Sequence, residues 1–191
     1  MPTLPQTVQD YAGNRTDISV SQFTHLWLQK SVIAIIEGSS NREDVVVIGS
    51  HQDSINLRNP ANGRAPGADD DGSGSMTILE IFRNLAQNGY KPELTVQFHW
   101  YSAEEVGLRG SAAVVSDFVD NDVDVRAMMQ IDMDGTVEMG WWWKVLSTFY
   151  LVSRLGYAIN SEIAIITDYT DPAVNNFVKR LIDEYCDIPW V

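Results

Sequence analysis

Four short segments of this chain carry side chains suited to metal or acid–base chemistry. They are His51-Gln52-Asp53, Asp69-Asp70-Asp71, Glu104-Glu105 and Asp132-Met133-Asp134. Imidazole nitrogens mixed with carboxylate oxygens form a ligand set that suits zinc or, less selectively, manganese or cobalt. Two such ions about 4 Å apart, bridged by one carboxylate, polarise a carbonyl group and activate water. The pattern predicts a metal centre, whose positive charge would also offset the repulsion between adjacent acids.

The pair Glu104-Glu105 has two interpretations. Neighbouring residues at the end of a strand point in different directions, so one glutamate can bind a metal while the other faces the metal-bound water as general base. The alternative is a pair of solvated surface glutamates. The three other acidic segments favour the first interpretation.

The stretch ADDDGSGSMTILE, residues 68–80, has the acid spacing of a calcium-binding loop. Such a loop needs a helix that enters it, and the preceding residues 56–68 contain Pro60, Pro66, Gly63 and Gly67, which break helices. We therefore expect an ordinary loop before a helix. Glu80, at the twelfth position, is expected to face solvent.

Short apolar runs alternate along the chain with segments of helical spacing. Strands are predicted at 31–38, 44–51, 93–102, 125–133 and 161–169, and helices at 75–89, 110–119 and 171–185. A turn-like SSNRE between the first two runs predicts an antiparallel hairpin there. The order predicts an α/β fold with a mostly parallel central sheet and helices on both faces. In such sheets the sites gather at the carboxyl ends of the strands, where the acidic segments lie.

Composition limits the other possibilities. The chain has 191 residues, a formal net charge of −13 and a single cysteine, Cys186, so no disulfide can form within it. We expect one domain over residues 1–191, no nucleic-acid partner, because little basic charge is present to neutralise phosphates, and no membrane partner. Of the other histidines, His25 is expected to be structural and His99 to be a packed or surface residue.

The segments GSHQDSIN, APGADDDGSG, YSAEEVGLRGS and QIDMDG resemble the motifs of secreted fungal and bacterial leucine aminopeptidases, which have a co-catalytic two-zinc site and a zinc-exopeptidase fold. The resemblance implies that His51 and Asp132 bind one zinc, that Glu105 binds the other and that Asp70 bridges both. It implies Glu104 as general base and Asp53 as the residue that orients His51. It also implies peptide substrates with a free, apolar N-terminal residue, and secretion.

The chain also departs from this family. The family's last zinc ligand, a histidine beyond the helix at 171–185, is absent, so we expect a fold that is incomplete at the C-terminus and impaired activity. Residues 140–161 have no counterpart in the family and are predicted to be an insertion. Two alternatives remain: an inactive metal- or peptide-binding remnant, or another zinc-exopeptidase-fold enzyme such as a carboxypeptidase or glutaminyl cyclase.

Overall fold

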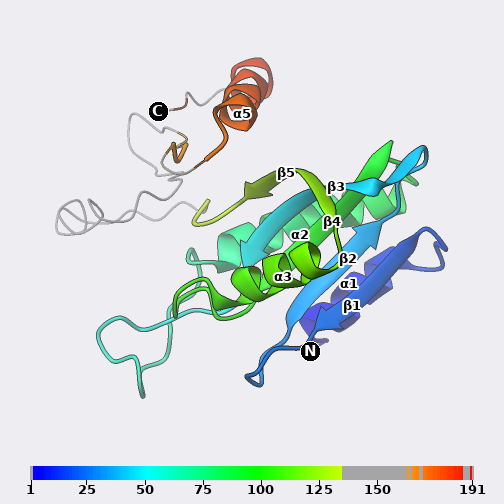
Figure 1. Cartoon of the computed structure of the whole chain (residues 1–191). Coiled ribbons are helices and arrows are strands. Elements are labelled where there is room, and N and C mark those ends of the chain that lie inside the picture. The colour runs from blue at the N-terminus through cyan, green and yellow to red at the C-terminus, as the bar shows by residue number, and fades with distance from the viewer. Residues whose placement is uncertain (1, 135–162, 164, 168–169, 187–189, 191) are drawn as a thin grey trace.

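The computed structural model describes residues 2–134, 163, 165–167, 170–186 and 190, and these contain one five-stranded sheet (Figure 1). The strands are β1 (Ile18–Phe23), β2 (Ser31–Ile36), β3 (Asn41–His51), β4 (Leu94–Tyr101) and β5 (Asp124–Gln130). The helices are α1 (Leu4–Ala12), α2 (Gly72–Gln87), α3 (Arg109–Asp120) and α5 (Pro172–Tyr185). None of the helices in this part of the chain is long and apolar enough to cross a bilayer.

The sheet is mixed and has the strand order β1-β2-β4-β3-β5. β3 runs parallel to both of its neighbours, β4 and β5, whereas β1 and β2 form antiparallel pairings. The α/β fold class is confirmed, and the parallel part of the sheet is the part that leads to the acidic segments.

The predicted hairpin of residues 31–38 with residues 44–51 is wrong. β4 lies between β2 and β3, antiparallel to the first and parallel to the second. β4 is buried along most of its length and takes the central place in the sheet, between β2 and β3. The turn-like residues between them connect strands that are not paired with each other.

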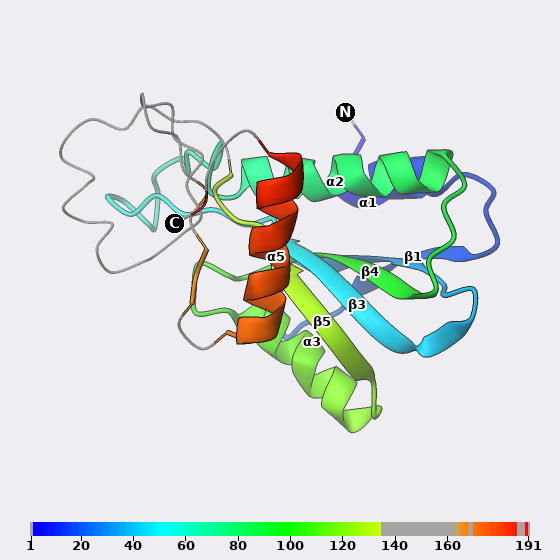
Figure 2. The ribbon, with the colours of Figure 1, turned by 90° about the horizontal axis from the view of Figure 1, so that it is seen from above.

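Helices cover both faces of the sheet (Figure 2). On one face α1 and α2 pack on β2 and β4, and on the other α3 contributes Val114 beside Ile33 and Tyr101. The alternation along β2, with Val32 and Ala34 toward one face and Ile33 toward the other, follows the two-residue period of a strand. Two cores therefore hold the central strands from both sides.

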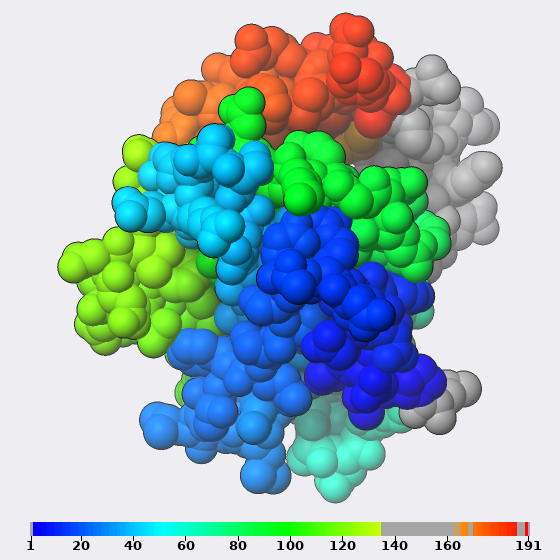
Figure 3. All heavy atoms as spheres, turned by 90° about the vertical axis from the view of Figure 1, so that its right-hand side faces the viewer, coloured from blue at the N-terminus to red at the C-terminus, as the bar shows by residue number. Residues whose placement is uncertain are grey.

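The N-terminal elements α1 and β1 were not predicted from the sequence. Arg15, which lies between them, connects this region to α2. Its guanidinium donates to the carbonyl oxygens of Leu85, Ala86 and Tyr90 and forms an ion pair of 2.6 Å with Asp17. Figure 3 shows the dark-blue N-terminal residues against this green part of the chain. The carbonyl oxygens of Leu85 and Ala86 also accept from the backbone N–H groups of Tyr90 and Gly89, so Arg15 adds a second donor at the end of α2.

The predicted helices are confirmed, although α2 begins three residues earlier than expected, at Gly72 rather than Ser75. The side chain of Asp71 caps it, and this cap offsets the poor helix propensity of its glycines. Asp171 caps α5 by accepting from the backbone N–H groups of Ala173 and Val174.

The region after residue 134 is described in part. Of the strand predicted at 161–169, the structure describes residues 163 and 165–167, and Ile163 makes only an isolated bridge to Trp190. The predicted insertion at 140–161 lies outside the described residues.

His99 on β4 is fully buried and hydrogen-bonded to Tyr101 and Gln97, which confirms it as a packed residue. Burial lowers its pKa to about 3, so between pH 3 and its ordinary value of 6.5 only the unfolded chain binds the proton. The free energy of unfolding should therefore fall as the pH drops below 6.5, with a contribution of up to about 1.4 kcal/mol per pH unit.

Urea unfolding between about pH 7 and pH 5 checks this, because His99→Gln should show a flatter pH dependence than the unaltered chain. His25→Gln is the control, since His25 is less deeply buried and should change the slope less. Equal slopes for the His99 variant and the unaltered chain would contradict the assignment of His99 as a buried neutral residue.

Candidate metal centre

The carboxyl ends of the three parallel strands meet at one edge of the sheet and deliver the acidic segments there. β3 ends at His51, β4 leads into the loop of Glu104 and Glu105, and β5 is followed by Asp132. The N-terminus of α2, preceded by Asp69-Asp70-Asp71, lies at the same edge. The topology therefore gathers the predicted side chains for the reason the sequence suggested.

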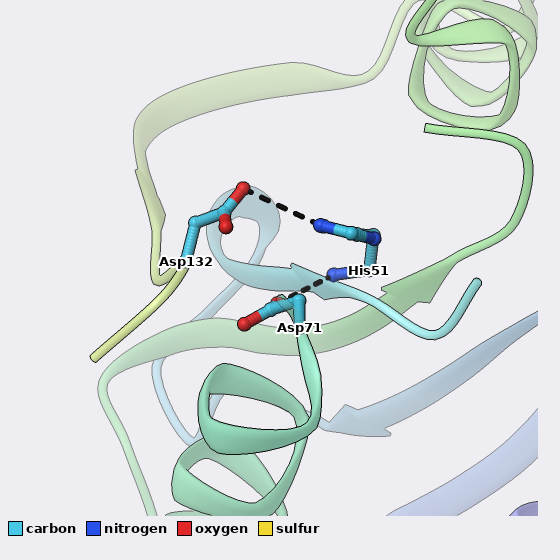
Figure 4. A group of neighbouring side chains, drawn as sticks. All are labelled: His51, Asp71 and Asp132. Atoms are coloured by element: carbon cyan, nitrogen blue, oxygen red, sulfur yellow. Dashed lines mark hydrogen bonds and ion pairs between the residues drawn. The ribbon is translucent and has the colours of Figure 1, made fainter. Parts of the chain in front are cut away.

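His51 is the centre of the cluster, 1% exposed, with its Nε2 atom facing carboxylates. Nε2 lies 3.0 Å from Asp70 Oδ1, 3.5 Å from Asp132 Oδ2 and 3.9 Å from Glu104 Oε2. Figure 4 shows the side chains of His51 and Asp132 pointing toward one another above the carboxylate of Asp71. Three of the predicted site residues thus surround the imidazole.

The other ring nitrogen fixes the chemistry of Nε2. Nδ1 lies 3.0 Å from the main-chain oxygen of Asp53, an acceptor, so Nδ1 carries a hydrogen. In the neutral ring Nε2 is then a lone-pair nitrogen, and this buried atom makes no hydrogen bond. A lone pair that faces carboxylates is unfavourable unless a proton or a cation lies between them.

A zinc ion fits this arrangement. Ligand atoms that bind one tetrahedral zinc at about 2.0–2.2 Å lie roughly 3.3–3.6 Å from one another. The separations of 3.0 and 3.5 Å between His51 Nε2 and the oxygens of Asp70 and Asp132 are close to that range. His51, Asp71 and Asp132 also form a group whose ligand atoms all lie within 4.8 Å of one another.

The close approach of these side chains perturbs their pKa values. Burial lowers the pKa of His51, but Asp132, Asp53 and Asp70 together raise it far above its ordinary value. Burial raises the pKa of Glu104, and burial with the charge of Asp70 raises that of Glu105 to about 7. A bound cation would reverse these upward shifts of the carboxylates, because it favours their charged form.

Asp53 was predicted to orient the imidazole of His51. The contact with Nδ1 is made by its main-chain oxygen at 3.0 Å, while its carboxylate lies at 3.7 Å. The carboxylate accepts instead from the backbone N–H groups of Glu104, at 3.0 Å, and Glu105, at 3.2 Å. Asp53 therefore joins His51 to the loop that carries both glutamates.

Glu105 lies further from His51, and its Oε1 accepts from the backbone N–H of Ile55 at 3.1 Å. Its assignment as a ligand stays a prediction, as do the ligand and base assignments of Asp70, Asp132 and Glu104.

The three consecutive acids have different surroundings. The side chain of Asp70 is 43% exposed and reaches the His51 ring, whereas Asp71 is 2% exposed and accepts backbone N–H groups. Of these three acids, only Asp70 was given a metal-bridging role from the sequence. The position of Asp71 directly before a glycine- and serine-rich helix start was the signal for a helix cap.

The calcium-loop interpretation finds no support in the described residues. Residues 52–68 contain no helix that could enter such a loop. Glu80 is exposed and forms an ion pair with Arg83 on the same face of α2. It therefore does not act as the twelfth-position ligand of a calcium loop.

Most of this chain is similar to known proteins. The model of peptidase family M28 matches residues 31–185. Leucine aminopeptidase 1 of Fusarium vanettenii is 44% identical over 191 residues, which cover 97% of this chain and 44% of that protein. The chain thus spans less than half the length of this relative.

Two solved structures of aminopeptidases are also similar to this chain, and the chain again covers less than half of each. The crystal structure of the LapA aminopeptidase of Legionella pneumophila superposes with a TM-score of 0.76 at 31% identity, covering 96% of this chain and 44% of that one. BSAP, a zinc aminopeptidase from Bacillus subtilis, shares the fold at 23% identity with a TM-score of 0.61, covering 85% of this chain and 34% of that one.

We expect Asp53→Ala to lower the free energy of unfolding by about 1–3 kcal/mol, because two backbone N–H groups lose a charged acceptor. Urea denaturation measures the change. Glu80→Ala is the control: it removes an ion pair on the exposed surface of α2 and should lower the free energy of unfolding much less. Equal costs for the two variants would show that Asp53 does not secure the glutamate loop.

Proposed function

The chain belongs to peptidase family M28, and from this premise we propose that the protein is a zinc-dependent aminopeptidase. It would remove apolar, leucine-like residues from the free N-terminus of peptides. The observation that carries the proposal is the buried, hydrogen-bond-free Nε2 of His51, which faces carboxylates at the carboxyl edge of the sheet. The names of the relatives, leucine aminopeptidase 1 and LapA aminopeptidase, support the type of reaction.

In this proposal His51, Asp70 and Asp132 hold one zinc, and Asp70 and Glu105 hold a second. When bound, zinc supplies a Lewis acid that polarises the scissile carbonyl and lowers the pKa of water. The chain's own contribution is to fix the ligands: the main-chain oxygen of Asp53 sets the tautomer of His51, so that Nε2 faces the cluster.

Glu104 is the proposed general base. Its Oε2 lies 3.9 Å from His51 Nε2, so a water molecule held in the cluster would be within reach of this carboxylate, which can accept and return a proton. Its backbone N–H is held by Asp53 at 3.0 Å, which limits the movement of the carboxylate. Glu104 would take a proton from the attacking water and pass it to the departing amine.

The proposed substrate also fits the charge of the cluster. Several carboxylates converge on one imidazole, so the site carries negative charge that attracts the α-ammonium of a free N-terminus. A blocked N-terminus lacks that charge. Secretion, which the resemblance implied, is part of the same proposal and rests on that resemblance alone.

The proposal is tested on a full-length protein that contains this chain. We expect release of leucine from a leucyl-anilide, loss of this activity with a chelator and its return with zinc. Glu104→Gln should lower kcat by about 10²–10⁴-fold, because the general base is removed while the shape is kept.

N-acetyl-leucyl-anilide is the matched substrate control and should not be cleaved. Activity that survives metal removal, or that is equal on the blocked substrate, would contradict the proposal. Zinc binding without turnover would favour an inactive metal-binding protein instead, and cleavage from the C-terminus would favour a carboxypeptidase.

A second prediction concerns the 191-residue chain alone. Of its histidines only His51 lies in the cluster, so we expect about one zinc per chain and little turnover. Elemental analysis after dialysis measures the zinc content, and His51→Ala should abolish retention. His25→Ala is the control and should keep the metal, because His25 packs on Trp27 instead. Two zinc ions per chain with robust turnover would contradict this prediction.

A further inference from the structure

We propose that Asp71 is a positioning residue of the metal centre: its carboxylate fixes the main chain beside His51 and Asp132 without binding the metal. The inference rests on the proposed function in one respect only, that a metal is bound. The hydrogen bonds that carry it join residues of the chain itself.

The carboxylate of Asp71 is a junction of three chain segments. Oδ2 accepts from the backbone N–H of His51 at 3.1 Å, and Oδ1 accepts from Gly74 at 2.9 Å and from Met133 at 3.2 Å. His51 ends β3, Gly74 lies in the first turn of α2, and Met133 directly follows Asp132. One buried side chain therefore sets the distance between the strand ends that present His51 and Asp132 (Figure 4).

These bonds leave Asp71 poorly suited to be a ligand. A carboxylate offers about four acceptor positions, and backbone donors take three of them here. Asp70, by contrast, places its Oδ1 3.0 Å from the ring nitrogen of His51. The distances within the group of His51, Asp71 and Asp132 alone would admit Asp71 as a ligand, so the two roles need separate experimental signatures.

Gly74 shows how closely the backbone is built around this carboxylate. A Cβ atom at this position would overlap Asp71 Oδ1 and lie 2.6 Å from the main-chain oxygen of Ile131. Glycine therefore lets the first turn of α2 approach both Asp71 and the segment that leads to Asp132. The close packing is what a positioning role requires.

The substitution Asp71→Asn distinguishes a positioning residue from a metal ligand. The new side chain has the same shape but one oxygen atom instead of two. Its amide group would face at least one of the three buried N–H groups, so one hydrogen bond is lost and two donors oppose each other. The strand ends should shift, and zinc affinity should fall roughly 10–100-fold, as for other partners behind metal ligands. The ligand set itself should be unchanged.

The experiment uses the 191-residue chain, titrated with zinc chloride alone by calorimetry, and then with cobalt(II) to saturation for its absorption spectrum. We expect Asp71→Asn to weaken zinc binding 10–100-fold and to keep the cobalt spectrum of the unaltered chain. Asp70→Asn should change the cobalt spectrum, because it alters a ligand. Asp171→Asn, the same substitution at the N-cap of α5, should change neither.

An unchanged zinc affinity for Asp71→Asn, or an altered cobalt spectrum at saturation, would overturn the inference. If this variant does not fold, amide hydrogen exchange of the unaltered chain decides. The backbone N–H groups of His51, Gly74 and Met133 should be protected from exchange before zinc is added. Protection that appears only with zinc would also overturn the inference. Failure of the unaltered chain to bind zinc would refute the proposed function while leaving the exchange result intact.

Discussion

The repulsion among carboxylates that converge on one imidazole is the constraint around which this edge of the sheet is built. Oxygen atoms of Asp70, Asp132 and Glu104 all lie within 3.9 Å of His51 Nε2. Like charges this close in a partly buried site are strongly unfavourable in the absence of a counter-charge. The positive end of α2 supplies part of that charge, and a cation at Nε2 would supply the rest.

Two further acids, Asp53 and Asp71, meet the same constraint differently, since their oxygens accept backbone N–H groups. Asp53 binds the N–H groups of Glu104 and Glu105, and Asp71 binds those of His51, Gly74 and Met133. Charge-assisted bonds of this kind are stronger than neutral ones. The cluster is therefore divided into acids that face the imidazole and acids that lock the loops behind them.

Sequence reasoning could place the acidic segments at one edge, because apolar runs such as 44–51 mark the strands that end there. It could not order the strands, since a turn between two runs predicts adjacency whereas long-range burial placed β4 between them. Nor could it separate the roles of Asp70 and Asp71 from geometry. Consecutive side chains in a loop take directions that depend on contacts with Met133 and His51, which are distant in sequence.

The division of the mixed sheet explains why the cluster can be both crowded and well ordered. β4, β3 and β5 pair as parallel neighbours, so their carboxyl ends lie side by side, and these ends lead to the glutamates, His51 and Asp132. The antiparallel β2 brings its first residue, Ser31, to that edge, where its hydroxyl oxygen accepts from the N–H of Ser102. The antiparallel strand β2 thus holds the start of the glutamate loop in place, and the parallel strands β3, β4 and β5 lead to the side chains of the candidate site.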